Sequence, residues 1–194
     1  MAGKTTQNKY PEVEGMYPEK ITVIVDTREQ YPVRFPTHVR IPNPRNARKE
    51  CLIDVAITKR KLDYGDYCLE GYEHGCVIER KASALELYTN LFGYKDKERQ
   101  GRALAKLVKE AEKPYLMLEV SPSKIMNAKL PHDTDPEILM NKLMGMVARY
   151  GLGLLWLPGR GGSCGRRTMG LTMVHLMLEH VMIRYYRKDP RLII

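Results

Sequence analysis

The sequence predicts an α/β domain with a mixed central β-sheet flanked by α-helices, and three observations lead to this fold class. Ile21–Val25 is a short β-branched run typical of a buried strand. Tyr64–Leu69 and Val77–Lys81 flank a turn that contains two glycines, which predicts a β-hairpin. From residue 83 onward, helical and strand patterns alternate, as they do where helices pack on the faces of a sheet.

The other elements follow from apolar periodicity and from the residues that begin and end helices. Ser83 is a candidate N-cap, Pro114 stops a helix and Gly151 is a candidate C-cap. Residues 31–50 contain four prolines and five basic residues, which predict an irregular basic loop. The further predicted strands are Leu52–Thr58, Tyr115–Val120 and Leu154–Leu157, and the predicted helices are Ser83–Leu91, Asp96–Lys113, Pro136–Tyr150 and Thr168–Arg187.

Length and composition predict a flexible polar tail over residues 1–19 and a single domain over residues 20–194. No apolar run approaches the roughly 18 residues of a membrane span, and the polar start lacks a signal-peptide core, so no membrane partner and a cytoplasmic location are expected. The four cysteines form no CxxC pair and no zinc spacing, which favours buried thiols, although one disulfide stays open.

The formal net charge is +9, and this charge favours a polyanionic partner such as nucleic acid. The glycine-rich segment Gly159–Arg167 fits a basic loop whose Arg160, Arg166 and Arg167 contact DNA phosphates, or a solvated loop. It lacks the Lys-Ser/Thr pair of a phosphate-binding loop, so no nucleotide cofactor is expected.

The chemistry is predicted in the hairpin. Side chains alternate along a strand, so Glu79 and Lys81 share one face while Arg80 points to the other. The hairpin returns Asp66 to within reach of Glu79, and two converging carboxylates offer hard oxygen ligands for Mg²⁺. Lys81 is then placed to orient an attacking water or to stabilise developing negative charge. The alternative is a surface hairpin that carries a salt bridge.

The sequence motifs in and before this hairpin resemble those of the XPF/Hef nuclease family within the PD-(D/E)xK superfamily. The residues are Gly65-Asp66-Tyr67, Glu79-Arg80-Lys81 and, upstream, Val25-Asp26-Thr27-Arg28-Glu29. The resemblance spans roughly residues 20–120 and implies a restriction-endonuclease-like core. It implies a DNA endonuclease that depends on Mg²⁺, with Mn²⁺ as a substitute.

The same resemblance implies roles for single residues. Asp66 and Glu79 are expected to be metal ligands, with the backbone carbonyl of Arg80 as a further ligand, and Lys81 is the expected catalytic lysine. Asp26 is the expected additional catalytic acid, and Arg28 and Glu29 are expected to support the site. Two alternatives stay open for the Arg80 side chain, because it can hold Glu29 or a DNA phosphate, or form an ion pair within the sheet.

Two departures from the family pattern limit what the resemblance implies for residue roles and domain organisation. The family's acidic residue four positions after the ERK lysine is replaced here by Leu85, and Glu86 lies one position further on, so Glu86 is either a site residue or a solvated helix position. Tandem helix-hairpin-helix repeats are not predicted, which favours a compact stand-alone form like those of phages, in a bacterial or phage-infected cell. A homodimer is expected because relatives dimerise.

The family's preference for branched, flap or junction DNA implies a role in DNA repair, recombination or replication. Arg99 and Arg102 follow the catalytic strand on the next helix and are expected to bind DNA, with a solvated helix face as the alternative. A non-catalytic DNA-binding or scaffold module with the same fold, and an RNA target, are the competing functions.

Overall fold

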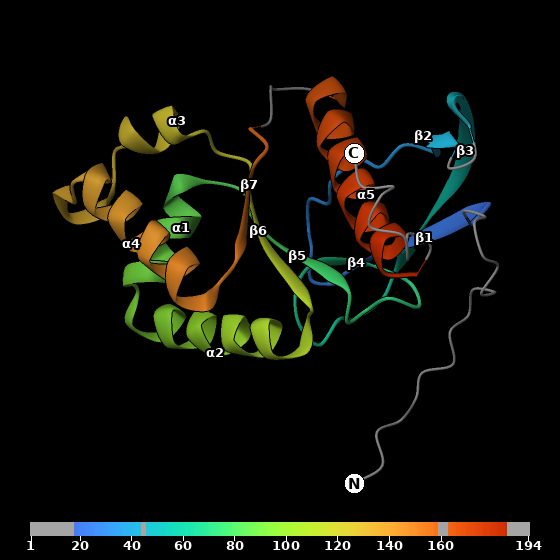
Figure 1. Ribbon diagram of the computed structural model, residues 1–194. Coiled ribbons are helices and arrows are strands. Elements are labelled where there is room, and N and C mark those ends of the chain that lie inside the picture. Colours follow the sequence, from blue (N-terminus) through green and yellow to red (C-terminus); the bar gives the residue numbers. More distant parts are fainter. Residues whose placement is uncertain (1–17, 44–45, 159–162, 186–194) are drawn as a thin grey trace, which may run out of the picture.

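The computed structural model describes residues 18–43, 46–158 and 163–185, and seven strands within them form one mixed sheet (Figure 1). Its order is β2-β3-β1-β4-β5-β6-β7. β1 runs parallel to β3, and β5, β6 and β7 run parallel to one another, whereas β4 is antiparallel to both of its neighbours. The strands are β1 (Lys20–Val25), β2 (His38–Asn43), β3 (Asn46–Lys59), β4 (Tyr67–Leu69), β5 (Cys76–Lys81), β6 (Lys113–Leu118) and β7 (Gly153–Trp156).

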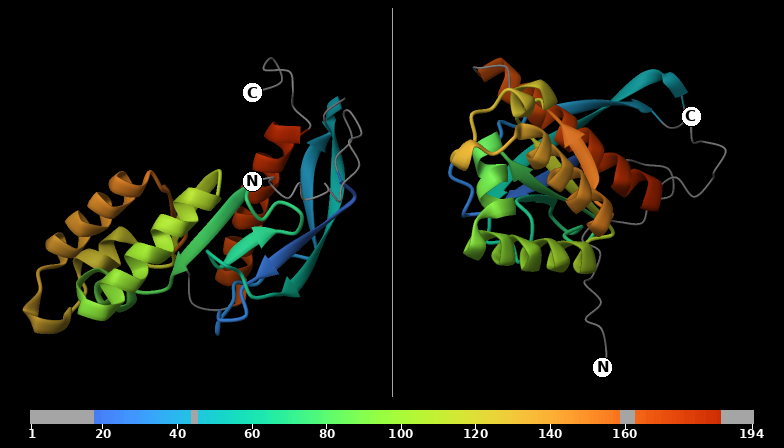
Figure 2. Two further views of the ribbon diagram at one scale, coloured as in Figure 1. Left: turned by 90° about the horizontal axis from the view of Figure 1, so that it is seen from below. Right: turned by 90° about the vertical axis from the view of Figure 1, so that its left-hand side faces the viewer.

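Helices cover both faces of this sheet, which confirms the predicted fold class (Figures 1 and 2). The α-helices are α1 (Ala84–Phe92), α2 (Tyr94–Glu110), α3 (Pro122–Met126), α4 (Pro136–Tyr150) and α5 (Ser163–Tyr185). α5 packs on one face through Met169, Met173 and Met177. α1, α2 and α4 pack on the other through an apolar cluster that includes Leu87, Leu104 and Leu139. None of the helices in the described part of the chain is long and apolar enough to cross a membrane.

Several predicted boundaries are confirmed. β4 and β5 pair antiparallel, as the hairpin prediction required. The Ser83 side chain caps α1 by accepting a hydrogen bond from the Glu86 amide. α4 spans the predicted residues, and Gly151 ends it with φ of 61°, in the left-handed region where glycine has no Cβ penalty.

The prediction of an irregular loop over residues 31–50 is wrong. His38–Asn43 is a strand that pairs antiparallel with β3, which itself begins at Asn46 rather than Leu52. Val39 and Ile41 are buried while their neighbours are exposed, and this alternation is the strand signal that the prolines concealed. Pro42 is tolerated because β2 is an edge strand of the sheet.

Several further boundaries differ from prediction, and α3 was not predicted at all. β4 begins at Tyr67 rather than Tyr64, and β6 already begins at Lys113 and includes Pro114. Gly93 rather than Asp96 is the N-cap of α2. Residues 163–167 open α5 instead of forming a loop, so Arg166 and Arg167 are helical. The predicted tail over residues 1–19 falls almost entirely outside the described residues, and the single domain over residues 20–194 stays a prediction.

Candidate active site

The predicted residues meet at one edge of the sheet, where β1, β5 and β6 end and β4 begins. β1 runs parallel to β5 because both are antiparallel to β4, so their carboxyl ends lie at the same edge. Asp26 follows β1 directly, and Asp66 precedes β4. The Asp26 amide donates to the Asp66 carbonyl at 2.9 Å, and the Asp66 amide donates to the Ile78 carbonyl at 2.9 Å. Backbone hydrogen bonds therefore fix the three strand ends relative to one another.

Gly65 sets the position of Asp66. Its φ of +68° lies in the left-handed region, and an added Cβ would overlap the Val77 side chain. The Asp66 carboxylate accepts a hydrogen bond from the Arg80 amide at 2.7 Å. Burial, followed by the negative charge of nearby Glu79, raises the pKa of Asp66 to about 8. The Glu79 carboxylate thus lies close enough to oppose the ionisation of Asp66.

Glu79 and Lys81 share one face of β5, as predicted from strand alternation. The Lys81 ammonium contacts Glu79 Oε1 at 2.7 Å and is 7% exposed. Burial works against the charged ammonium, but Glu79 above all, with Asp66 and Glu86, raises the pKa of Lys81 above its ordinary value. The lysine is therefore held in its charged form beside the two carboxylates.

In the described part of the chain, the second oxygens of the two carboxylates have no donor and are not fully buried. Among the described residues, no donor bonds to Asp66 Oδ1 or Glu79 Oε2, and none of the buried polar side-chain atoms lacks a hydrogen-bond partner. Both residues line an open depression of about 300 Å³ with Lys81 and Glu86. Two carboxylate oxygens at the wall of a solvent-filled depression can bind a hard cation.

Glu86 contributes from α1. Its Oε2 accepts a hydrogen bond from the Ala82 amide at 2.8 Å, and its Oε1 lies 3.7 Å from the Lys81 ammonium. The side chain is 37% exposed and borders the depression. Its hydrogen bond with the Ala82 amide also caps the N-terminus of α1. The structure thus brings Glu86 to the predicted site, while its role in chemistry stays a prediction.

The Arg80 side chain points to the other face of the sheet. Its Nη1 lies 2.9 Å from Glu29 Oε1 and its Nε lies 2.9 Å from Glu119 Oε1, and the guanidinium is 7% exposed. Although burial opposes its charge, the Glu119 hydrogen bond and charge raise the pKa of Arg80. Of the alternatives for Arg80, the structure therefore contains the ion pairs, and contact with a DNA phosphate stays a prediction. The backbone carbonyl of Arg80 as a metal ligand also stays a prediction.

Asp26 does not line the depression, and its predicted role beside the metal stays a prediction. Its carboxylate is fully buried and accepts four hydrogen bonds. They come from the Arg28 amide at 2.7 Å, from Arg28 Nε at 2.7 Å and Nη2 at 2.9 Å, and from the Leu62 amide at 2.7 Å. Burial raises its pKa, but the Arg28 and Leu62 hydrogen bonds outweigh burial and lower it. With both oxygens in use, Asp26 joins the end of β1 to the segment before Asp66.

Four of the predicted DNA-binding arginines lie on α2 and α5 and do not line the depression. Arg99 pairs with Asp96 at 2.7 Å and Arg102 lies 3.9 Å from Glu98, both on exposed positions of α2. Arg166 and Arg167 lie in the first turns of α5, and Arg160 falls outside the described residues. DNA binding by this group stays a prediction.

Sequence analysis missed two residues of this site. Gln100 on α2 is buried, and its amide nitrogen lies 3.4 Å from Glu79 Oε1. Its position four residues before Leu104 places it on the apolar stripe of that helix, which was an available signal. Glu119 forms an ion pair with Arg80. It directly follows β6, just as Asp26 directly follows β1. A polar residue directly after a buried strand was therefore the sequence signal for both site residues.

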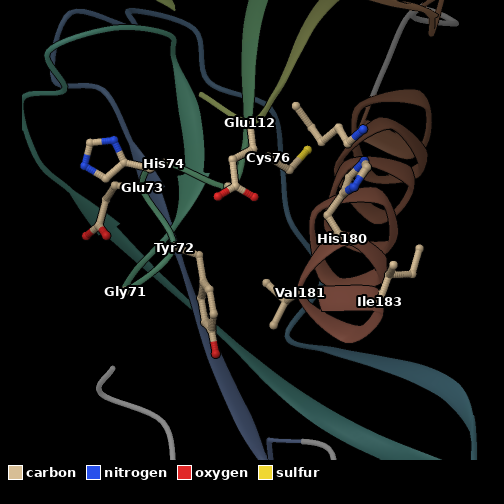
Figure 3. Close-up of a pocket in the computed structure, with 11 residues that line it drawn as sticks. Gly71, Tyr72, Glu73, His74, Cys76, Glu112, His180, Val181 and Ile183 are labelled. Atoms are coloured by element: carbon tan, nitrogen blue, oxygen red, sulfur yellow. The ribbon is translucent and has the colours of Figure 1, made fainter. Parts of the chain in front are cut away.

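A second cavity, of about 310 Å³, lies at the opposite end of β5 (Figure 3). Glu112 and His180 point into it from opposite walls, and Cys76, the first residue of β5, lines it. Burial and the positive charge of Lys113 lower the pKa of His180, whose Nε2 lies 3.0 Å from the Tyr115 hydroxyl. This cavity shares no residue with the depression around Asp66.

Comparison with known proteins gives structural matches only. No family model and no curated protein sequence matches the chain. A structure of XPF from Aeropyrum pernix is similar, with a TM-score of 0.51 and 19% identity, over 84% of this chain and 65% of that chain. XPF from Aeropyrum pernix in complex with DNA gives a TM-score of 0.50 and 19% identity, over 88% of this chain and 69% of that chain. The chain thus spans about two thirds of the length of these structures and has a fold similar to theirs.

Proposed function

We propose that this protein is a metal-dependent DNA endonuclease that hydrolyses phosphodiester bonds. The proposed substrates are branched, flap or junction DNA, met in repair, recombination or replication. One observation carries the proposal: the Asp66 and Glu79 carboxylates share a solvent-filled depression with the buried Lys81 ammonium. Burying two carboxylates beside a single lysine costs folding free energy unless other charges compensate them. A metal cation and a substrate phosphate would do so.

Two further facts support a nucleic-acid substrate. The net charge of +9 attracts polyanions, and the XPF-like fold occurs in a protein whose structure includes bound DNA. The homodimer, the compact phage-type form and the cytoplasmic location remain predictions, and the proposal does not depend on them.

The residues present fit Mg²⁺, with Mn²⁺ as its substitute. Mg²⁺ is commonly bound through one or two carboxylates, with water and substrate phosphate completing its shell, and Asp66 Oδ1 and Glu79 Oε2 have no hydrogen-bond donor among the described residues. In the described part of the chain, no group of three or more His, Cys, Asp or Glu side chains is arranged to hold a metal. A metal site that has two protein carboxylates and takes its other ligands from water and the substrate phosphate is consistent with that finding.

The chain's own residues then have separate tasks. Bound Mg²⁺ would supply positive charge for the phosphate and lower the pKa of a coordinated water. Asp66 must lose its proton to bind a cation, because its pKa is about 8 in the metal-free protein. Lys81 keeps its proton and donates hydrogen bonds toward the attacking water or the phosphate oxygens. Gln100 and Lys81 both bond Glu79 Oε1, which leaves Oε2 directed elsewhere.

The test uses purified protein with end-labelled flap, fork, four-way and linear DNA, with and without Mg²⁺. We expect cleavage only with the metal, and faster cleavage of at least one branched substrate than of linear duplex. Asp66→Ala, Glu79→Ala and Lys81→Ala are each expected to lower the cleavage rate by at least about 100-fold, while circular dichroism shows a folded protein.

Two outcomes would reject parts of this proposal. Full activity in Asp66→Ala or Glu79→Ala excludes the metal assignment. Binding without cleavage, across all substrates and with both Mg²⁺ and Mn²⁺, favours a non-catalytic DNA-binding module instead. A matched RNA substrate in the same assay distinguishes an RNA target.

A further inference from the structure

A polar cavity of about 350 Å³ lies between α1, α2 and α4, on the same side of the sheet as Glu79. Its polar lining comes from all three helices: Asn90 from α1, Lys97 and Gln100 from α2, and Asn141, Lys142 and Arg149 from α4. The rest of its wall comes from Leu91, Gly101, Leu104, Gly145, Met146 and Tyr150. None of the six polar residues was predicted from the sequence to belong to the site.

The charge of this cavity is uniformly positive. Lys97, Lys142 and Arg149 line it, and no Asp or Glu does. Within the described part of the chain, none of these three cations forms an ion pair with a carboxylate, whereas Arg99 and Arg102 on α2 both do. The Lys142 ammonium lies 4.7 Å from the centre of the Phe92 ring, which orients the lysine without neutralising it. Three uncompensated cations around one concavity fit an anionic ligand.

Two hydrogen bonds join the cavity to the candidate active site. Gln100 lines the cavity and its amide nitrogen reaches Glu79 Oε1 at 3.4 Å. Asn90 also lines it, and its side-chain nitrogen donates to the Glu86 carbonyl at 2.6 Å. Asn90 lies one helical turn from Glu86, which lines the depression around Lys81. Residues of the cavity thus contact residues of the depression at two points.

We propose that this cavity binds a backbone phosphate of the DNA strand that runs through the depression, next to the phosphate that is cleaved. The proposal rests on the DNA endonuclease function above and adds a location for the flanking strand. Successive phosphates recur every few ångströms along a strand, so adjoining sites can hold neighbouring ones. Lysine and arginine supply the charge, and the Asn90 and Asn141 amides supply donors to phosphate or sugar oxygens.

The test compares two triple variants that remove the same charge. The first replaces the cavity cations, as Lys97→Gln, Lys142→Gln and Arg149→Gln. The control replaces Lys95→Gln, Lys106→Gln and Lys109→Gln, which lie on α2 but do not line the cavity. Affinity for a fluorescent single-stranded DNA and for a forked DNA is measured by anisotropy in EDTA, over a range of salt concentrations. Thermal melting verifies that both triple variants are folded.

The cavity variant should bind single-stranded DNA with a salt dependence, d log K/d log[salt], reduced in magnitude by about 0.7, because one phosphate contact on a single strand contributes about that much. If affinity at 1 M salt is unchanged, that reduction corresponds to roughly fivefold weaker binding at 0.1 M salt. The control triple should lose less than about twofold, since surface charges away from a phosphate act only through screened attraction.

Equal losses in the two triples would overturn the proposal, because they would indicate general charge attraction. An unchanged DNA affinity of the cavity variant would also overturn the proposal. The same holds if inorganic phosphate binds saturably to the wild type but leaves its affinity for DNA unaltered. These results are distinguishable from failure of the proposed function. A wild-type protein that binds DNA through the cavity but never cleaves it with Mg²⁺ or Mn²⁺ rejects the nuclease and retains the subsite.

Discussion

Asp66→Asn is expected to abolish metal-dependent cleavage and, at the same time, to stabilise the metal-free protein. The wild-type carboxyl is buried beside Glu79, and these two effects raise its pKa from 3.8 to about 8. An asparagine keeps the acceptor for the Arg80 amide but removes the charge. We expect the free energy of unfolding at pH 8 to rise by about 3 kcal/mol, since each pH unit between the two pKa values is worth about 1.4 kcal/mol and Glu79 shares part of the effect.

The sign of the pH dependence follows from proton binding. Between pH 3.8 and about 8 the folded protein holds the Asp66 proton while the unfolded chain has released it. Stability of the wild type should therefore fall as pH rises through this window, and the Asn variant should lose this part of the slope. Urea unfolding of the wild type and Asp66→Asn at several pH values in EDTA measures the free energy of unfolding and its pH dependence. Equal stability of the two proteins at pH 8 would contradict the raised pKa.

Replacing Arg80 by methionine is expected to destabilise the fold by about 3–5 kcal/mol, because removal of one partner leaves the others buried and unpaired. Glu29 and Glu119 are only 11% and 13% exposed, and Arg80 is the residue that bridges them. Loss of the bridge also loosens the strand that carries Glu79 and Lys81, so cleavage should fall together with stability. Urea unfolding monitored by circular dichroism gives the free-energy difference.

Two matched controls separate burial from charge. Arg40→Met breaks the ion pair of Arg40 with Glu50, whose side chains are 69% and 64% exposed, and should cost less than about 1 kcal/mol. The triple variant Glu29→Gln, Arg80→Met, Glu119→Gln should recover most of the stability lost by Arg80→Met, because no uncompensated buried charge remains. A cost for Arg80→Met no larger than that of Arg40→Met would reject the buried bridge.

The parts of the fold that the sequence predicted are those set by local patterns. Alternation along β5 placed Glu79 and Lys81 together and Arg80 apart, and a capping serine and a glycine marked the ends of α1 and α4. The edge strand β2 was missed because Pro42 and nearby prolines outweighed the alternation of Val39 and Ile41. Edge strands tolerate proline, and sequence alone does not show which strand is at an edge.

The parts of the site that were missed depend on contacts between distant residues. Gln100 reaches Glu79 from another helix, and Glu119 reaches Arg80 from the neighbouring strand. No spacing rule within a segment reports such pairs. Asp26 shows the converse, because its place after a buried strand was recognised, but its four hydrogen bonds from Arg28 and Leu62 were not.

Mn²⁺ binding, measured by electron paramagnetic resonance, tests most directly the claim that Asp66 and Glu79 together hold a divalent metal. Free Mn²⁺ is titrated with wild-type protein, Asp66→Asn, Glu79→Gln and Lys81→Met, at pH 8.5 and with DNA present. We expect the wild type and Lys81→Met to bind the metal, with Lys81→Met unable to cleave, and each carboxylate variant to bind at least about tenfold more weakly. Unchanged Mn²⁺ affinity in Asp66→Asn and Glu79→Gln would contradict the assignment of this hairpin as the metal centre.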